Sequence, residues 1–480
     1  MFRFFSVAAV SLLITLSLTA QEQIGSDLLG FEADEQYGYS VQLSGDARLV
    51  VIGGPFSDDG TGSMRVFADI FNEWSFQWGI TGIEGGASGL AVDISDDGNM
   101  VAIGSPGTIQ GQVNVFEKVG IDYSSIGPGF VGPDELANLF GSAISLSGDG
   151  KRVAVGARSF DGVGDDVGYV EVFEFIDNEW RTIGSPLDSP LPFGEMGRSL
   201  DLSYDGSIMA IGIPTTPDNT GEGQVQVYKF EDIGDWELMG EPIVGGLDLT
   251  GYSVAISGDG MRIAVGAPAG AGKVQVFEYQ DDGWQQLGGP MSINSSRVSG
   301  FSTDISSDGN RVIVGALGSN SSSTPGAVGV YDFDGTTWSS PFQEITGLVG
   351  EAFGWSVSLS ADGETFAVGA PGNDDGNNDQ GKVEIYEIGP TSVSILDAEA
   401  ANLSVFPNPT RGLLNIKGPD LDRQRLARVI SASGQTVYAS YLRAEQMDIS
   451  QLPSGVYHVL IPHGSSDYVL HKVVKNDSPN

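Results

Sequence analysis

The side chains with the greatest capacity for chemistry are carboxylates, and many of them gather in short polar segments between apolar runs. Four such segments are acidic: Asp58–Asp59, Asp161 with Asp165–Asp166, Asp218 with Glu222, and Asp374–Asp375 with Asp379. In the last segment oxygen-bearing side chains take alternate positions, at Asn373, Asp375, Asn377 and Asp379. Ca²⁺ binds about six to eight oxygens, so these four residues form a candidate calcium site. Because Gly376 comes too early for a D-x-[DN]-x-[DN]-G loop, a solvated loop of turn-forming residues remains the alternative.

Other catalytic side chains are scarce. The sequence has no cysteine, which excludes thiol catalysis and Cys-bound metals. Its three histidines, His458, His463 and His471, all lie near the C-terminus, so the rest of the chain lacks Ser-His-Asp chemistry and His-bound zinc. We therefore predict that the protein is not an enzyme. A glycosidase needs only two carboxylates, one of them kept protonated, so a carbohydrate-active enzyme with paired carboxylates stays open as the alternative.

A repeat positions these segments. Seven times the chain runs through a glycine, an alternating apolar strand, a Ser-x-Asp-Gly turn, a second apolar strand ending in glycine, a loop, and Gly-x-Val-x-Val-aromatic, with local departures. The turn aspartates are Asp46, Asp97, Asp149, Asp205, Asp259, Asp308 and Asp362, spaced 49 to 56 residues apart. A period near fifty with several strands per unit is typical of a β-propeller. The sequence therefore predicts an all-β fold with seven blades.

Each repeat predicts four strands, and the fourth is marked by a tryptophan in most repeats. These tryptophans are Trp74, Trp180, Trp236, Trp284 and Trp338, and their regular place predicts core packing between blades. Trp355 takes the first-strand position of Tyr39 and Tyr252 and is predicted to be structural as well, whereas Trp78 is left without an assignment.

The last repeat lacks its fourth strand, and residues 23–30 (QIGSDLLG) resemble the missing piece. We predict that this N-terminal segment closes the ring, which would remove an open sheet edge. The loops between the second and third strands vary in length, while the distance from turn Asp to the following glycine is constant. The binding face is therefore predicted on the variable loops, opposite the Ser-x-Asp-Gly turns.

The N-terminus predicts export. Arg3, an apolar run and Ala20 form a signal peptide over 1–20, and no other stretch could cross a bilayer, so the mature chain is predicted to have no transmembrane segment. Residues 21–396 hold 14 Lys and Arg against 55 Asp and Glu, a balance of −41 within a net charge of −40. Such a field repels phosphate backbones and anionic membranes, so nucleic-acid binding is excluded.

The repeats resemble the FG-GAP repeats of integrin α-subunit propellers. The FG half stands at 140–143 (FGSA) and 353–356 (FGWS), and the GAP half at 265–268 and 368–371 (both VGAP). The resemblance implies a seven-bladed ring that binds protein ligands on its loop face. The calcium loops of that family lie in the first hairpin, which here has shrunk to Ser-x-Asp-Gly, so those metal positions are not carried over.

The C-terminal residues resemble the sorting domain of type IX secretion. Three motifs occur in order, FPNP at 406–409, VISASGQTV at 429–437, and GVY at 455–457 with KVVK at 472–475. The resemblance implies a small β-sandwich that directs export through the type IX machinery of a Gram-negative cell. The residues that carry this sorting signal are Pro407, Asn408, Pro409, Gly412, Gly434, Gly455, Lys472 and Lys475.

The predicted organisation is a signal peptide at 1–20, a propeller at 21–389, a linker at 390–402 and a sorting domain at 403–475. We predict a secreted or outer-surface binding protein that reaches its destination through the periplasm, with a protein or glycan as its ligand. No cofactor is required, and Ca²⁺ at 373–379 is the one candidate.

Overall fold

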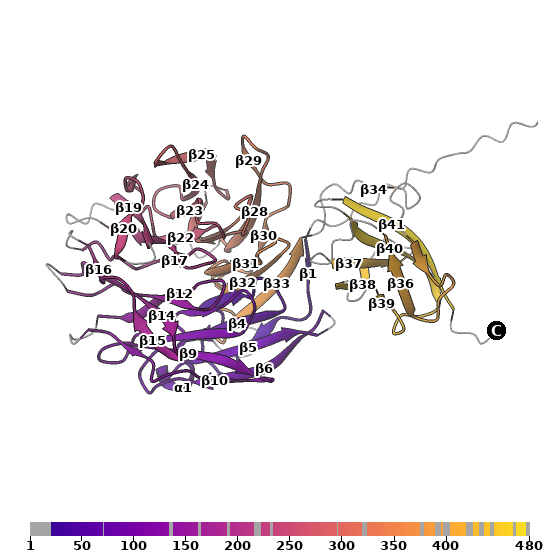
Figure 1. The fold of residues 1–480 in the computed structure, drawn as a ribbon, viewed down its shortest axis with the longest axis horizontal. Helices are drawn as coiled ribbons and strands as arrows, with labels where there is room; N and C mark the ends of the chain where they lie inside the picture. Colours follow the sequence, from indigo (N-terminus) through magenta and orange to yellow (C-terminus); the bar gives the residue numbers. More distant parts are fainter. Residues whose placement is uncertain are drawn as a thin grey trace, which may run out of the picture. The chain divides into compact units, whose positions relative to one another are not determined.

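The computed structural model describes residues 21–70, 72–133, 138–161, 165–189, 193–215, 222–230, 234–294, 296–318, 324–374, 379–388, 395–396, 404–418, 426–431, 436–441, 446–463 and 467–476. The predicted signal peptide lies outside these ranges. The chain beyond it divides into two compact units, Gln21–Ile388 and Gly389–Asn480 (Figure 1). Each unit is described separately.

The first unit consists of seven antiparallel sheets, numbered here as blades in chain order. Blade 1 holds β3 (Ser40–Leu43), β4 (Leu49–Gly54), the helical turn α1 (Ser57–Gly60), β5 (Ser63–Asp69) and β6 (Trp74–Thr81). Blade 2 holds β7 (Val92–Ile94), β8 (Met100–Ser105), β9 (Gln112–Val119), β10 (Asp122–Ser125) and β11 (Phe130–Val131). Blade 3 holds β12 (Phe140–Leu146), β13 (Arg152–Ala157), β14 (Tyr169–Ile176), β15 (Glu179–Thr182) and β16 (Leu187–Asp188). Blade 4 holds β17 (Leu200–Leu202), β18 (Ile208–Ile213), β19 (Glu222–Phe230), β20 (Trp236–Leu238) and β21 (Ile243–Leu247).

The remaining blades repeat the order of strands from inside to outside. Blade 5 holds β22 (Ser253–Ile256), β23 (Arg262–Ala267), β24 (Lys273–Gln280) and β25 (Gly283–Met291). Blade 6 holds β26 (Arg297–Ile305), β27 (Arg311–Gly318), β28 (Ala327–Phe333), β29 (Trp338–Ser339) and β30 (Ile345–Thr346). Blade 7 holds β31 (Ser356–Leu359), β32 (Thr365–Ala370) and β33 (Lys382–Ile388), completed by β1 (Gln21–Gln23) and β2 (Leu28–Leu29).

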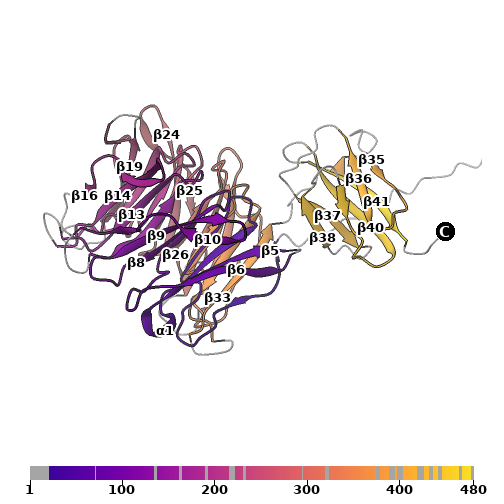
Figure 2. The same cartoon turned by 60° about the horizontal axis from the view of Figure 1, so that its bottom comes forward.

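The inner strands form a closed ring. Each of β3, β7, β12, β17, β22, β26 and β31 contacts the next, and β31 contacts β3 again. The predicted closure by the N-terminus is confirmed, because β1 pairs antiparallel with β33 in the register Gln21↔Ile388, and β2 pairs with it at Leu28↔Val383 (Figure 1). Figure 2 shows the sheets of this unit turned by 60°. Leu28 is buried against Val383 in the core between blades 7 and 1. The two ends of the propeller segment therefore lie side by side in the sheet of blade 7, and this pairing closes the all-β ring.

The recurring glycines have a steric cause. A Cβ on Gly369, at the end of β32, would collide with the carbonyl oxygen of Gly38 at the start of blade 1. The same contact recurs around the ring, in pairs that join the second strand of one blade to the first strand of the next: Gly53 with Gly89, Gly104 with Gly141, Gly156 with Gly197, Gly212 with Gly251, Gly266 with Gly300, and Gly315 with Gly354. Only glycine permits this approach, so the FG and GAP halves of the repeat are the two sides of one contact between blades.

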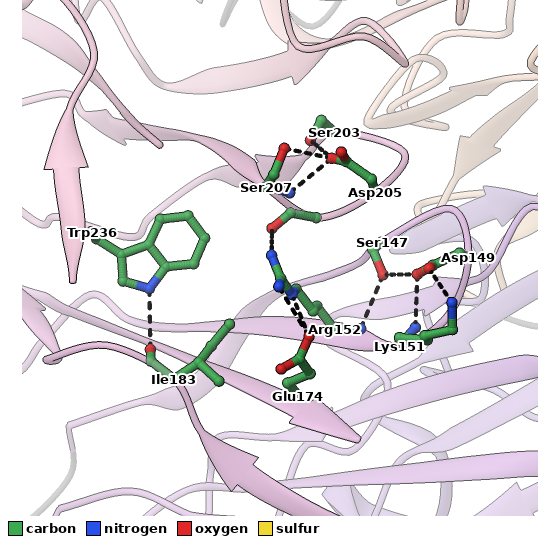
Figure 3. Close-up of polar contacts among 11 residues, drawn as sticks. Ser147, Asp149, Lys151, Arg152, Glu174, Ile183, Ser203, Asp205, Ser207 and Trp236 are labelled. Carbon is green, nitrogen blue, oxygen red and sulfur yellow. Dashed lines mark hydrogen bonds and ion pairs between the residues drawn. The ribbon is translucent and has the colours of Figure 1, made fainter. Parts of the chain in front are cut away.

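The Ser-x-Asp-Gly turns are held by the same hydrogen bonds in every blade. In blade 3 the Ser147 hydroxyl donates to Asp149 at 2.8 Å, and the backbone N–H of Lys151 donates to the same carboxylate oxygen (Figure 3). Arg152 then forms an ion pair with Glu174 at 2.9 Å and donates to the Gly206 carbonyl of the next turn at 3.0 Å. The equivalent arginines Arg262 and Arg311 make the same bridge in blades 5 and 6. The turns therefore fasten neighbouring blades.

The fourth-strand tryptophans pack between blades, as the sequence predicts. Trp236 Nε1 donates to the Ile183 carbonyl of blade 3 at 3.2 Å (Figure 3), and Trp284 and Trp338 make the same bond one and two blades further on. Trp78, which had no predicted role, packs against Phe116 of blade 2 with ring centroids 5.1 Å apart.

The second unit holds two sheets. One has the order β34 (Ile395–Leu396), β41 (Asp467–Lys475), β40 (Gly455–His463), β37 (Leu426–Ser431) and β38 (Thr436–Tyr441). The other has the order β35 (Ser404–Phe406), β36 (Leu413–Lys417) and β39 (Gln446–Asp448). One core is shared by residues of both sheets. β34 falls within the predicted linker, yet it pairs in parallel with β41.

Most of the predicted sorting residues lie along β41 and the segment that enters β36, and Gly455 begins β40. Asn408 Nδ2 donates to the Lys472 carbonyl at 2.7 Å, and the Val474 N–H donates to Asn408 Oδ1 at 2.9 Å. A Cβ on Gly412 would meet Ser450. Asn408 therefore fixes the entry segment to the last strand. Gly434 lies outside the described residues.

Candidate functional site

One repeat position, at or near the start of the inner strand, lies at the loop-face end of the propeller axis in each blade. These seven positions, each seven residues before the turn aspartate, are Tyr39, Leu90, Ser142, Arg198, Tyr252, Phe301 and Trp355. Four of them form an aromatic half, in blades 5, 6, 7 and 1, two form a polar half, in blades 3 and 4, and Leu90 of blade 2 is aliphatic. The variable loops predicted to form the binding face surround this end of the ring.

The aromatic half is a continuous arc, defined here as Tyr252, Phe301, Trp355 and Tyr39. The ring centroids of Tyr252 and Phe301 lie 5.1 Å apart, those of Phe301 and Trp355 4.8 Å, and those of Trp355 and Tyr39 5.0 Å. Adjacent rings are tilted by 46° to 53°. All four side chains are half-buried, so each keeps part of its surface accessible to solvent. Trp355, predicted as a structural residue, thus also contributes accessible aromatic surface.

The polar half carries two arginines. The guanidinium of Arg198 lies 4.1 Å from the centroid of the Tyr252 ring and forms an ion pair with Glu195 at 2.9 Å. Arg158 follows β13 in blade 3, and within the described ranges it makes no hydrogen bond or ion pair. The Ser142 hydroxyl is buried and also makes no hydrogen bond in the described part of the chain.

These groups converge on one phenol. Burial raises the pKa of Tyr39, while the guanidinium groups of Arg158 and Arg198 lower it and the Tyr252 phenol raises it further. Blades 4 and 5, which carry Arg198 and Tyr252, lie across the ring from blade 1, and blade 3 lies two blades from it. Half-buried aromatic rings therefore adjoin the Arg198 guanidinium at this end of the axis, an arrangement typical of binding sites for small polar ligands.

The opposite end of the axis, on the turn face, holds a cluster of three aspartates. Asp93, Asp201 and Asp304 occupy one repeat position in blades 2, 4 and 6, four residues before the turn aspartate. Each accepts the N–H of its own following residue and one from the next blade: Leu146 N–H donates to Asp93 at 2.5 Å, Ile256 N–H to Asp201 at 2.8 Å and Leu359 N–H to Asp304 at 2.6 Å. Ser145 and Ser358 accept the equivalent N–H groups in blades 3 and 7. These side chains therefore tie the inner strands together.

The three carboxyl groups are shifted toward the neutral form. Burial raises the pKa of Asp201 to about 6 and that of Asp304 to about 7, and their mutual repulsion adds to the rise for Asp304. Burial likewise raises the pKa of Asp93 well above its usual range. The three aspartates line a cavity of about 610 Å³, counting its solvent-open part, whose rim carries Asp96 and Tyr204. This cavity lies on the turn face, opposite the predicted binding face.

Backbone hydrogen bonds also join neighbouring blades at the turn-face end of the axis. The residue between the turn serine and aspartate donates its N–H to the equivalent carbonyl of the next blade, as from Gly45 to Asp96 at 2.9 Å and from Ala361 to Gly45 at 3.0 Å. In blade 3 the donor is Asp149 instead. The seven bonds form a closed belt around the axis, which makes the cavity part of the scaffold.

Two of the four predicted calcium ligands, Asp375 and Asn377, lie outside the described residues. Asn373 is buried, and its amide donates to Glu351 Oε1 at 2.7 Å. The same Glu351 oxygen pairs with Lys382 Nζ at 3.0 Å. Asp379 has a positive φ of 45°, and its N–H donates to Asp374 at 2.8 Å. Within the described ranges, no group of three or more His, Asp or Glu side chains is arranged to hold a metal ion.

Comparison with known protein families bears on both units. The FG-GAP repeat family matches residues 347–386, which comprise most of blade 7, and the secretion system C-terminal sorting domain family matches residues 404–476. The chain therefore contains a segment that matches the FG-GAP repeat family and a C-terminal segment that matches the sorting domain family. The sorting domain marks the protein for secretion to the surface of a Gram-negative cell by the type IX machinery.

Other comparisons are distant. The solved structure of Kuenenia stuttgartiensis hydrazine synthase is similar to this chain at 16% sequence identity and a TM-score of 0.49, covering 75% of this chain and 96% of that one. No curated protein matches the sequence. In the described part of the chain, no helix combines the length and apolar character that a membrane crossing requires.

The sequence analysis did not predict either group of side chains at the axis, although each group has a pattern in the sequence. The three buried aspartates recur at one repeat position in alternate blades, and the arc residues recur at another. A comparison of equivalent positions across the seven repeats, and not only of the motif that they share, identifies both groups.

Proposed function

We propose that this chain is a secreted, non-enzymatic binding protein that recognises an extracellular protein or glycan at the loop-face end of its propeller axis. The observation that carries this proposal is the arc of Tyr252, Phe301, Trp355 and Tyr39, whose half-buried rings come from four consecutive blades. Aromatic side chains with few internal degrees of freedom provide contact area at low entropic cost. Secretion by the type IX route supplies the extracellular setting.

The buried carboxylates of the loop face support a binding role over a hydrolytic one. Glu35 is fully buried, pairs with Arg65 and accepts the N–H of Phe31 at 2.6 Å. Glu351 pairs with Lys382 and accepts the N–H of Leu348 at 2.7 Å. A general acid must instead be held protonated beside its substrate. Both groups are engaged in fixing the connections between blades.

Binding to a panel of immobilised extracellular proteins and polysaccharides tests the proposal. The probe is the fluorescently labelled mature chain, and each polysaccharide is also assayed for released reducing ends. We expect at least one ligand to be retained uncleaved, and we expect the double change Phe301→Leu and Trp355→Leu to abolish retention. The matched control is Tyr204→Ala, which removes a half-exposed aromatic side chain from the turn face. Cleavage of a polysaccharide, or equal loss of binding in the control, would overturn the proposal.

A further inference from the structure

The joint between blades 7 and 1 presents two exposed phenylalanines on the loop face. Phe31 lies in the connection from β2 to β3 and is 62% exposed, and Phe56 follows β4 and is 40% exposed. One residue holds both of them, because the Phe31 N–H donates to Glu35 Oε2 at 2.6 Å and the Phe56 N–H donates to the Glu35 carbonyl at 3.4 Å. The two aromatic side chains therefore belong to one fixed surface.

This surface is rigid from below and continuous with the aromatic arc. Glu35 is fully buried and pairs with Arg65, whose guanidinium lies 4.2 Å from the centroid of the Phe31 ring. The Phe56 ring meets the Tyr39 ring edge to face, with centroids 6.2 Å apart. A ligand that covers Phe56 can therefore extend onto the arc without leaving aromatic surface.

Exposed carboxylates border the two rings. The Asp58 N–H donates to the Glu32 carboxylate at 3.2 Å, which brings the acidic side chains of the two loops together, and Asp59 follows directly. All three side chains are exposed, and within the described ranges none of them forms an ion pair. The nearby Arg65 is already paired with the buried Glu35. The negative charge beside the rings is therefore left without a cation from the described residues.

The turn explains short polar residues at two of these positions but not their charge. Asp58 and Asp59 have φ of 51° and 55°, in the left-handed region. Asparagine adopts this conformation as readily as aspartate does. An Asp-to-Asn change therefore keeps the backbone and removes only the charge, which lets the two roles be measured separately.

Exposed aromatic rings beside unpaired carboxylates complement the side chain of arginine. A guanidinium stacks on an aromatic ring and donates two parallel hydrogen bonds to a carboxylate. Acidic saccharides and phosphate groups are repelled by this surface, and a neutral glycan leaves its carboxylates without a counter-charge. The chemistry of the surface favours a protein ligand with a cationic segment.

The joint patch is defined here as Phe31, Glu32, Phe56, Asp58 and Asp59. We propose that the joint patch docks an arginine-bearing segment of an extracellular protein. The inference rests on the proposed function, because it names the ligand class for the same face. The guanidinium pairs with the carboxylates, and apolar side chains of the segment cover Phe31 and Phe56. No covalent step is involved.

Fluorescence anisotropy of a labelled peptide, titrated with the mature secreted chain, tests the inference. The peptide alternates arginine, glycine and phenylalanine, and the matched probe carries citrulline, a neutral isostere, in place of every arginine. We expect the arginine peptide to bind roughly tenfold or more tightly than the citrulline peptide, because charge-assisted pairs are lost with the charge.

A pair of double variants separates the joint patch from the general negative field of the chain. Asp58→Asn with Asp59→Asn should weaken binding of the arginine peptide roughly fivefold. Asp281→Asn with Asp282→Asn is the matched control, since these exposed aspartates also have positive φ, at 51° and 62°, but lie in the hairpin between β24 and β25. Both double variants lose the same charge, so the control should bind as the unmodified chain does.

A second pair of variants tests the aromatic part of the joint patch. Phe31→Ala removes an exposed ring and should weaken binding about threefold, the size of an exposed cation–π contact. Phe76→Ala is its control, because Phe76 is 52% exposed on the outer strand β6. The control should leave the affinity for the peptide unchanged.

The outcomes separate the two proposals. No binding of the arginine peptide, equal affinity for the two peptides, or equal effects of a variant and its control would overturn docking at the joint patch. If a panel ligand is still bound and the Phe301→Leu and Trp355→Leu double change abolishes its retention, the proposed function stands with a different ligand class. If no panel ligand is retained but peptide binding depends on Asp58 and Asp59, the joint patch stands and recognition at the axis falls.

Discussion

Gln21 pairs with Ile388, so the first residue after the predicted signal peptide lies opposite the last residue of the propeller unit in a single sheet. Closure of the ring therefore depends on both ends of a segment of more than three hundred residues. Such a long-range pairing forms only after the whole propeller sequence is available.

Deletion of residues 21–29 should destabilise the propeller markedly. The loss of the buried Leu28 side chain alone should cost about 2–5 kcal/mol, and the exposed edge of β33 should promote association. Chemical denaturation and size-exclusion chromatography measure both effects. The control is Gln23→Ala, which keeps the strand backbone and should change the unfolding free energy by less than about 0.5 kcal/mol. A deletion variant as stable and monodisperse as the control would show that β1 and β2 do not close the ring.

Gly369→Ala should be strongly destabilising, because the new Cβ would collide with the Gly38 carbonyl at the joint between blades 7 and 1. We expect a loss of about 1–3 kcal/mol in unfolding free energy, the usual cost of forcing atoms into a packed interface. Gly289→Ala is the matched control, since a Cβ there would meet nothing within 4 Å. If the two variants unfold at the same denaturant concentration, the steric account of the FG-GAP contact is wrong.

Stability should fall as pH rises through neutrality. Asp304 has a folded-state pKa of about 7, above its unfolded value, so its contribution is complete below the unfolded pKa and is lost as pH passes the folded pKa. Asp201, with a pKa of about 6, acts in the same direction, and Asp93 and Asp96 are the other carboxyl groups facing this cavity. Between about pH 5 and pH 8 we expect a loss on the order of 2 kcal/mol.

Asp304→Asn isolates this effect, because the amide does not titrate. Unfolding free energies at the two pH values should differ less in this variant than in the unmodified chain. Glu237→Gln, which removes an exposed carboxylate from β20, should retain the full pH dependence. An unchanged slope in Asp304→Asn would show that the cavity carboxyls do not control it.

Calcium should have no effect on the melting temperature. Asn373 is buried, with its amide nitrogen donating to Glu351, so its side-chain oxygen is not open to an ion from solvent. Thermal scans with added Ca²⁺ and with a chelator provide the measurement. A rise in melting temperature with Ca²⁺ that Asp379→Asn removes would show that residues 373–379 bind the ion after all.

Much of the propeller fold can be predicted from the sequence repeat. The glycines and the Ser-x-Asp-Gly turns predict the strand order, because each enforces a local geometry that depends on few neighbours. The outer-strand role of residues 23–30 also follows, since blade 7 lacks a segment that the N-terminus supplies. The second unit follows in the same way from its three ordered motifs.

The axial sites do not follow from local geometry. Tyr39 and Tyr252 are 213 positions apart in the chain, and they become neighbours of the same arginines only when seven blades close into a ring. In the sequence, Asp304 is only a polar residue within an apolar strand. Its role depends on the next blade, because its carboxylate accepts the Leu359 N–H from there. The sequence pattern specifies which residues share a register position, whereas the ring decides which of them meet.

The most direct test of the proposed binding role is a crystal structure of the mature chain with its bound saccharide or protein ligand. The account predicts ligand density against the rings of Tyr252, Phe301 and Trp355. Density confined to the turn-face cavity beside Asp201 and Asp304, with the arc unoccupied, would contradict it.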